Sequence, residues 1–308
     1  MPDRLINSAA LALLILIWGT TWAAIRIGLQ GIPPFLGISL RFAIASLVLF
    51  LVAWITGVRL RGGRLEWSLW AVNGLLAFTT SYGVVYWSEQ WIPSGLAAVL
   101  FATYPLFVAV LAHLLLPGER LRLRSSLGLL LGFFGLMIIY SEDLSALAGK
   151  EARLAAVVFL ISPAVSAVAN VAVKRWGRSM HPLSLTAVPM GFTAIVMGGL
   201  AALFERTEVV VFDRVSIAAL IYLALCGTSI TFFVFFWLLQ RLPATRLSLI
   251  TYGVPVVAVV VGTLFMKEPL TVRITAGAVL VLLGVLLAMQ KAREPLTAPS
   301  LDAPDTPR

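Results

Sequence analysis

The chain carries little charge, one cysteine and two histidines. Charged residues make up 12% of its 308 residues, hydrophobic residues make up 60%, and the mean hydropathy is +0.98. A soluble domain of this size needs far more charge on its surface. The lone Cys226 excludes a disulfide framework and a paired-thiol metal site. The composition therefore predicts a membrane protein.

Sequence motifs for catalysis are also missing. His113 and His181 have no carboxylate close to them in the sequence, and no Gly-rich phosphate loop, HExxH or CxxC pattern is present. We therefore expect no enzymatic activity, no metal and no cofactor.

Long apolar runs fill the chain, each close to the ~20 residues that a helix needs to cross a bilayer. Continuous apolarity without period-2 alternation excludes a membrane β-barrel. The predicted fold class is an all-α polytopic membrane protein. Its ten expected transmembrane helices lie near residues 5–25, 35–58, 67–88, 92–116, 125–141, 154–173, 183–204, 215–239, 247–266 and 274–290.

The chain contains an internal duplication between residues 86–135 and 236–284. A looser echo upstream pairs Arg26 and Pro34 with Lys174 and Pro182. Counterparts in the duplicated segment are Tyr86-Trp87, Gln90, Pro93 and Pro105 with Phe236-Trp237, Gln240, Pro243 and Pro255, and, after a one-residue gap, Glu119, Arg124, Gly128 and Gly135 with Glu268, Arg273, Gly277 and Gly284.

Each copy holds five apolar spans, so the second copy enters the membrane from the opposite side. We expect two inverted five-helix repeats, residues 1–145 and 146–290, followed by a disordered cytoplasmic tail at 291–308. Transporters use this architecture to alternate access about a central site.

The net charge of +9 reflects topology rather than nucleic-acid binding. With the N-terminus inside, the inner segments carry roughly twice as many Lys and Arg residues as the outer loops. The positive-inside rule then predicts that both termini are cytoplasmic.

The duplication also locates a candidate substrate pathway. Ser162, Ser166 and Asn170 recur every four residues on one helix face, and the repeat offset lays this face over Trp18 and Trp22. Two indoles opposite a polar stripe would give one cavity with an apolar wall and a polar wall, which suits a small amphiphile. Interhelical hydrogen bonding is the alternative role for the stripe.

Aromatic and hydroxyl residues on other spans extend this candidate site. Thr79, Tyr82 and Tyr86 share one face of the third span, and Phe232 repeats Tyr82 in the eighth. Core packing is the alternative for such a stripe, but lipid gains nothing from the interleaved hydroxyls. The predicted substrate-binding set is Trp18, Trp22, Thr79, Tyr82, Tyr86, Phe101, Tyr104, Ser162, Ser166, Asn170, Phe232 and Tyr252.

Two prolines and three charged residues complete the candidates. Pro105 and Pro255 each remove a backbone hydrogen bond in mid-span, and we predict a shared hinge or gating role. Arg41 is the one strong charge well inside a span, so either a structural partner or an anionic substrate group should lie beside it. Glu119 and Glu268 precede the fifth and tenth spans and are expected to cap helices.

Several of these residues also form a recognisable pattern. Trp18-Gly19, Arg26, Pro34 and Arg41, followed by Gly118-Glu119 and Gly128-x6-Gly135, resemble the signature of the EamA-type family of the drug/metabolite transporter superfamily. The second copy repeats the latter part, but it has Ser166-Ala167 in place of Trp18-Gly19 and Pro189 in place of Arg41. The resemblance covers Trp18 to about Met289. It implies a ten-helix inner-membrane exporter of bacterial metabolites, most similar to the YddG-type aromatic amino-acid exporters.

The expected function is export of aromatic and other neutral amino acids, or similar small metabolites, across the bacterial inner membrane by alternating access. No span has Asp or Glu at its centre, so we expect no coupling through a buried carboxylate. The same absence disfavours the main alternative, a multidrug exporter of organic cations. An integral membrane enzyme is the remote alternative. The expected partners are the bilayer and a small-molecule substrate, without nucleic acid, and the expected state is a monomer.

Overall fold

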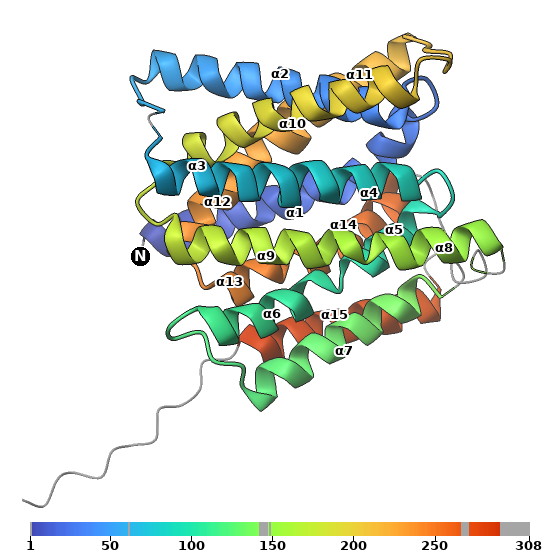
Figure 1. The fold of residues 1–308 in the computed structure, drawn as a ribbon. Coiled ribbons are helices and arrows are strands. Elements are labelled where there is room, and N and C mark those ends of the chain that lie inside the picture. The colour runs from blue at the N-terminus through green and yellow to red at the C-terminus, as the bar shows by residue number, and fades with distance from the viewer. Residues whose placement is uncertain (1, 61, 142–146, 148, 266–270, 290–308) are drawn as a thin grey trace, which may run out of the picture.

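The computed structural model describes residues 2–289 except 61, 142–146, 148 and 266–270, and the regular structure in this part of the chain is helical. The helices lie side by side and run back and forth between two ends of one bundle (Figure 1). The end where α1 (Pro2–Gly28) begins is called the N-terminal end below. The opposite end, where α2 (Pro34–Ile55) begins, is called the Pro34 end.

The remaining elements in the described part of the chain follow in order: α3 (Arg64–Val72), the π-helix η1 (Asn73–Thr80), α4 (Ser81–Ser88), α5 (Ser94–Phe101), α6 (Tyr104–Leu115), α7 (Leu123–Ile139), α8 (Lys150–Phe159), α9 (Ile161–Trp176), α10 (Pro182–Phe204), α11 (Arg214–Ala224), the π-helix η3 (Leu225–Ile230), α12 (Thr231–Arg241), α13 (Ala244–Ser248), α14 (Ile250–Phe265) and α15 (Val272–Met289).

Seven helical segments in the described residues are long and apolar enough to cross a membrane, and α7 is a shorter apolar helix. This confirms the all-α class and the membrane-spanning character predicted from the sequence. The predicted tail at 291–308 and the predicted repeat boundary at 145 lie outside the described residues.

Interrupted helices shape the interior of the bundle. The π-helical turns η1 and η3 occupy matching positions in the two copies, each directly before the helix that carries the duplicated aromatic pair. Pro105 coincides with a break, since α5 ends at Phe101 and Pro105 lies in the first turn of α6. Pro255 lies inside α14. In this copy the helix is interrupted before the proline, at Leu249, between α13 and α14.

Glycines bring α7 and α15 into backbone contact. A Cβ on Gly284 would lie 2.6 Å from the Gly128 carbonyl oxygen, and a Cβ on Gly277 would lie 2.6 Å from the Gly135 carbonyl oxygen. Small residues at membrane helix interfaces allow such close approach. Exchanging each glycine for its counterpart in the other copy turns one contact into the other, as a twofold relation requires.

A second pair of contacts joins α2 to α10 in the same way. Ser39 Oγ donates to the Ala194 carbonyl oxygen, and Ser46 Oγ donates to the Ala187 carbonyl oxygen, each at 2.8 Å. The offset that relates Pro34 to Pro182 also relates Ser39 to Ala187 and Ser46 to Ala194. The two hydrogen bonds are therefore twofold counterparts, although serine is present on only one side.

Carboxylates cap helices of the other half of the chain. Glu119 accepts from the backbone N–H groups of Ala244 at 2.9 Å and Thr245 at 3.1 Å, at the start of α13. Glu205, just past α10, accepts from Phe35 N at 2.7 Å and Leu36 N at 2.9 Å, at the start of α2. A carboxylate satisfies the free donors of a helix N-terminus and suits its dipole.

The capping expected of Glu119 therefore holds, but the helix that it caps is α13 and not the span that follows Glu119. Glu268 lies outside the described residues. Asp213 caps its own helix: it accepts from the Ser216 backbone N–H at 2.6 Å, and this bond lowers the pKa of Asp213.

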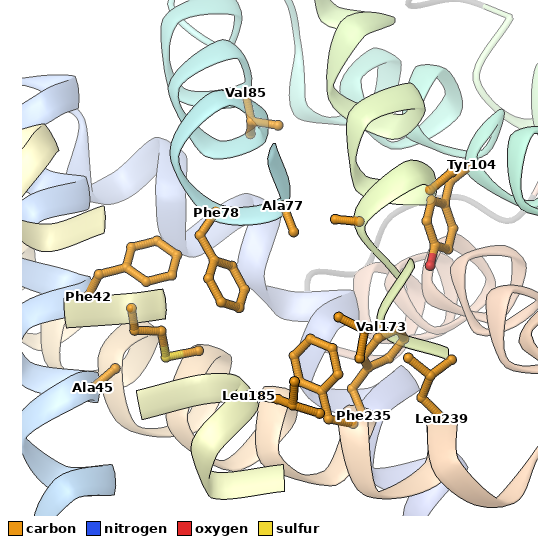
Figure 2. Packing of buried hydrophobic residues seen from close by; sticks show 14 of the residues in the cluster. Phe42, Ala45, Ala77, Phe78, Val85, Tyr104, Val173, Leu185, Phe235 and Leu239 are labelled. Atoms are coloured by element: carbon orange, nitrogen blue, oxygen red, sulfur yellow. The ribbon is translucent and has the colours of Figure 1, made fainter. Parts of the chain in front are cut away.

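The hydrophobic core draws on both halves (Figure 2). Phe42 of α2 and Phe78 of η1 pack with ring centroids 5.4 Å apart. Leu185 of α10 and Phe235 of α12 belong to the same buried cluster. The core is thus a shared interface between the halves.

The glycine contact between α7 and α15 can be tested by adding one methyl group. Gly284→Ala places a Cβ against the backbone of α7 and should destabilise the protein by about 1–3 kcal/mol, because overpacking forces backbone shifts. Gly199→Ala in α10 is the matched control, since its Cβ would meet nothing within 4 Å. Thermal melting in detergent should show a lower midpoint for Gly284→Ala only. Equal midpoints for the two variants would contradict the contact.

Candidate functional site

A cavity of about 110 Å³ lies between the two halves of the chain. Its lining residues come from both copies and are Trp18, Thr21, Trp22, Ile25, Arg41, Ala77, Ser81, Tyr82, Val85, Ala98, Phe101, Tyr104, Ser166, Asn170, Phe232, Phe235, Thr251, Val254 and Pro255.

Aromatic rings form one wall of this cavity. The Trp18 ring lies 5.6 Å from Phe232 and 5.7 Å from Phe235, measured between ring centroids. The Trp22 ring lies 5.8 Å from Phe101 in an edge-on arrangement. These separations are typical of favourable aromatic pairs. The indoles are therefore held in place by other rings.

Hydroxyl and amide groups form a second wall, mainly on α4 and α9. Ser81 Oγ lies 2.8 Å from Ser162 Oγ and accepts a hydrogen bond from Ser166 Oγ at 2.9 Å. Asn170 Nδ2 donates to the Tyr104 hydroxyl at 3.0 Å. Since Ser166, Asn170 and Tyr104 also line the cavity, a ligand can reach polar groups that are already oriented by their neighbours.

Arg41 supplies the positive charge among the lining residues, and only 1% of its surface is exposed. Its Nε donates to Thr228 Oγ1 at 2.6 Å, and its two terminal nitrogens donate to the Tyr86 hydroxyl and the Gly227 carbonyl oxygen, each at 3.2 Å. The guanidinium carbon also lies 4.9 Å from the centre of the Tyr82 ring.

The sequence left two possible partners for Arg41, a structural group or an anionic substrate group. The structure shows structural partners. Gly227 and Thr228 belong to η3, where the π-helical turn changes the backbone hydrogen bonding. Arg41 therefore ties α2 to the irregular turn of the other half and still presents its charge to the cavity.

Most of the residues predicted from the repeat line this one cavity. They are Trp18, Trp22, Tyr82, Phe101, Tyr104, Ser166, Asn170 and Phe232. Pro255, predicted as a hinge, also lies in the lining, whereas Pro105 does not.

Four predicted residues lie outside the lining, and the polar group of each bonds to a neighbouring residue. Thr79 donates to Thr193 at 3.1 Å, and Ser162 is fully buried beside Ser81. Tyr86 bonds to Arg41, and the Tyr252 hydroxyl donates to the Leu129 carbonyl oxygen at 2.9 Å, within a separate core cluster.

The sequence reasoning missed other lining residues, and helix spacing could have found some of them. Thr21 follows Trp18 by three residues, and Phe235 follows Phe232 by three, so each shares a face with a predicted residue. The missed set is Thr21, Ile25, Ala77, Ser81, Val85, Ala98, Phe235, Thr251 and Val254.

The model of the EamA-like transporter family matches the chain twice, over residues 7–141 and 153–290. The chain belongs to this family. This confirms the resemblance seen in the sequence and the expectation of a membrane transporter.

Relatives of similar length carry transporter names. "Uncharacterized transporter YoaV" of Bacillus subtilis is 28% identical, covering 88% of this chain and 92% of the relative. "Uncharacterized inner membrane transporter YedA" of Escherichia coli K12 is 29% identical and covers 94% of each chain. "Probable amino-acid metabolite efflux pump", also of Escherichia coli K12, is 24% identical and covers 89% of this chain and 91% of the relative.

A solved crystal structure has the same fold. It superimposes with a TM-score of 0.80 at 21% identity and covers 92% of this chain and 96% of the other. At this identity the likeness concerns the fold alone.

Proposed function

We propose that this protein exports aromatic and other neutral amino acids, or similar small metabolites, across the inner membrane by alternating access at the cavity. The observation that carries the proposal is the make-up of one cavity lining, which combines the indoles of Trp18 and Trp22 with the polar groups of Ser166, Asn170 and Tyr104. One relative of the chain bears the name of an amino-acid metabolite efflux pump.

In the proposed complex, the substrate side chain lies against Trp18 and Trp22. Its polar backbone atoms lie near Ser166 and Asn170, and its carboxylate is favoured by the positive charge of Arg41. A zwitterionic amino acid carries an apolar group and polar groups in one small molecule, as this mixed lining requires.

Alternating access fits an architecture of ten spans in two inverted repeats. Three further helical paths supplement the seven long spans: residues 64–88 through η1, α7 itself, and residues 244–265. The twofold-related contacts between α7 and α15, and between α2 and α10, support the inverted relation of the halves.

A multidrug exporter of organic cations is the main alternative function. Asp and Glu are absent from the described residues that line the cavity, and Arg41 presents a positive charge to it. A cationic substrate would meet repulsion without a compensating carboxylate, so zwitterions and neutral amphiphiles fit better. An enzyme is less consistent with the transporter names of the relatives.

The expectation that no buried carboxylate couples transport stays a prediction. That expectation considered only the centres of the spans. Glu89, at the end of α4, is 4% exposed and therefore buried despite its position.

Substrate discrimination by the two walls gives a direct test of the site. Asn170→Ala removes a polar partner shared by all amino acids and should weaken transport of phenylalanine and threonine alike, by about 1–3 kcal/mol. Trp22→Ala should weaken mainly the transport of phenylalanine, because aromatic pairs contribute roughly 0.5–1.5 kcal/mol beyond burial. Transport of both substrates is measured at matched expression.

Trp91→Ala is the control, because Trp91 is half exposed and does not line the cavity. Equal losses for both substrates in Trp22→Ala, together with a silent Asn170→Ala, would remove this cavity from consideration as the site.

The orientation in the membrane can be tested with single cysteines in a Cys226→Ser background. Ser179 is exposed at the N-terminal end and Gln30 at the Pro34 end. With both termini cytoplasmic, an impermeant thiol reagent added to whole cells should label Gln30→Cys and leave Ser179→Cys unlabelled until the cells are opened. The reverse pattern would overturn the proposed orientation.

A further inference from the structure

Glu89 is a buried carboxylate next to the cavity. It lies just past the end of α4, and its backbone N–H donates to the carbonyl oxygen of Val85, a lining residue, at 2.9 Å. Neither carboxylate oxygen has a hydrogen-bond partner in the described part of the chain. An ionised carboxylate is costly to bury without a partner. Glu89 is therefore suited to bind a proton or to pair with a cation that moves to it.

Two cations flank Glu89. Burial raises the pKa of Glu89 to about 8, against the opposing effects of Arg26 and Arg41. Arg41 already donates to Thr228, Tyr86 and Gly227. Arg26, at the end of α1, is exposed, and no hydrogen bond from it is seen among the described residues. Arg26 is therefore the cation that is free to move to Glu89.

Other elements packed against α4 bring no charge to Glu89. The buried residues of α8 are apolar, and Ser88 donates to the Ala155 carbonyl oxygen there at 3.2 Å. The charged residues of α8, which are Lys150, Glu151 and Arg153, are exposed. Those of α9, Lys174 and Arg175, lie at the N-terminal end of the bundle.

In the second copy, the position equivalent to Arg26 and Glu89 is already held by hydrogen bonds. Arg26 corresponds to Lys174, Glu89 to Leu239 and Ile92 to Leu242. Lys174 Nζ donates to the Leu239 carbonyl oxygen at 2.5 Å and to the Leu242 carbonyl oxygen at 2.8 Å.

These two bonds tie α9 to the end of α12, one helical turn beyond Asn170 of the cavity. Lys174, the cation of the second copy, is thus hydrogen-bonded at the N-terminal end. Arg26, the cation of the first copy, makes no such bonds at the Pro34 end among the described residues.

We propose that Glu89 is a proton-binding site, and that its ionised form pairs with Arg26 to close the Pro34 end of the cavity. In the present conformation the carboxyl holds its proton. On closing, the proton passes to water at that end, and the carboxylate–guanidinium pair takes the place that the Lys174 contact holds at the other end. The inference rests on the alternating access proposed above and adds how protons bias it.

The direction of the pH effect follows from proton counting. The paired conformation binds one proton fewer, because a neighbouring cation lowers the pKa of a carboxyl. Acid therefore favours the present conformation. The paired conformation gains as pH rises through the window that ends at about 8.

Labelling of a cavity cysteine without substrate tests this inference. Ala98 lines the cavity on α5, and Ala98→Cys in a Cys226→Ser background is reacted with a thiol reagent in proteoliposomes at about pH 6 and about pH 9. Each rate is divided by the rate of the same cysteine with Glu89→Gln, which cancels the titration of the thiol itself. The ratio should be near one in acid and should fall about threefold or more in alkali.

Companion variants keep the test decisive if Glu89→Gln folds poorly. Glu89→Asp and the exposed control Glu151→Gln should keep the alkaline fall in labelling, and Arg26→Gln should lose it. A ratio near one at both pH values, or a fall that persists in Arg26→Gln, would overturn the inference. Because no substrate is present in this experiment, neither result bears on the proposed export of amino acids, which the Trp22 and Asn170 variants test separately.

Discussion

The structure depends on one constraint: a backbone group inside a membrane-spanning bundle must find a partner within the protein. The few charged side chains of this chain serve that need across the two halves. Arg41 satisfies the irregular turn of η3, Glu119 caps α13, and Glu205 caps α2. Each of these contacts joins an element of one half to an element of the other, so the charged residues hold the halves together.

The cavity follows from how the halves meet. Glycines let α7 and α15 touch along their backbones, and serines of α2 bond to the α10 backbone. The remaining space is lined by residues of α1, α2, η1, α4, α5, α6, α9, α12 and α14, many of them aromatic or hydroxyl-bearing. The duplication thus explains why indoles of the first copy and a polar stripe of the second share one cavity.

The sequence predicted the parts of the site that depend on helix spacing and on the repeat offset. Trp18 and Trp22 share a cavity with Ser166 and Asn170, as the offset indicated. The sequence could not distinguish a side chain that lines the cavity from one that is buried behind the lining. Ser162 shares the face of Ser166, but its hydroxyl is fully buried beside Ser81.

Other features depend on tertiary contacts that leave no local pattern. Two of the three hydrogen-bond partners of Arg41 come from a π-helical turn, which has no spacing signature in the sequence. Glu89 stands at the end of a span, where a carboxylate is ordinarily solvated, and only the packing of the neighbouring helices buries it. The helix that Glu119 caps could not be known before the halves were placed together.

The central claim is that the cavity accepts zwitterionic or neutral amphiphiles and passes them across the membrane. Its most direct test is exchange in proteoliposomes preloaded with phenylalanine and challenged with a panel of neutral amino acids and organic cations. The account predicts that neutral amino acids, aromatic ones foremost, exchange with the loaded substrate while organic cations do not. Exchange driven by organic cations, with the amino acids inert, would contradict it.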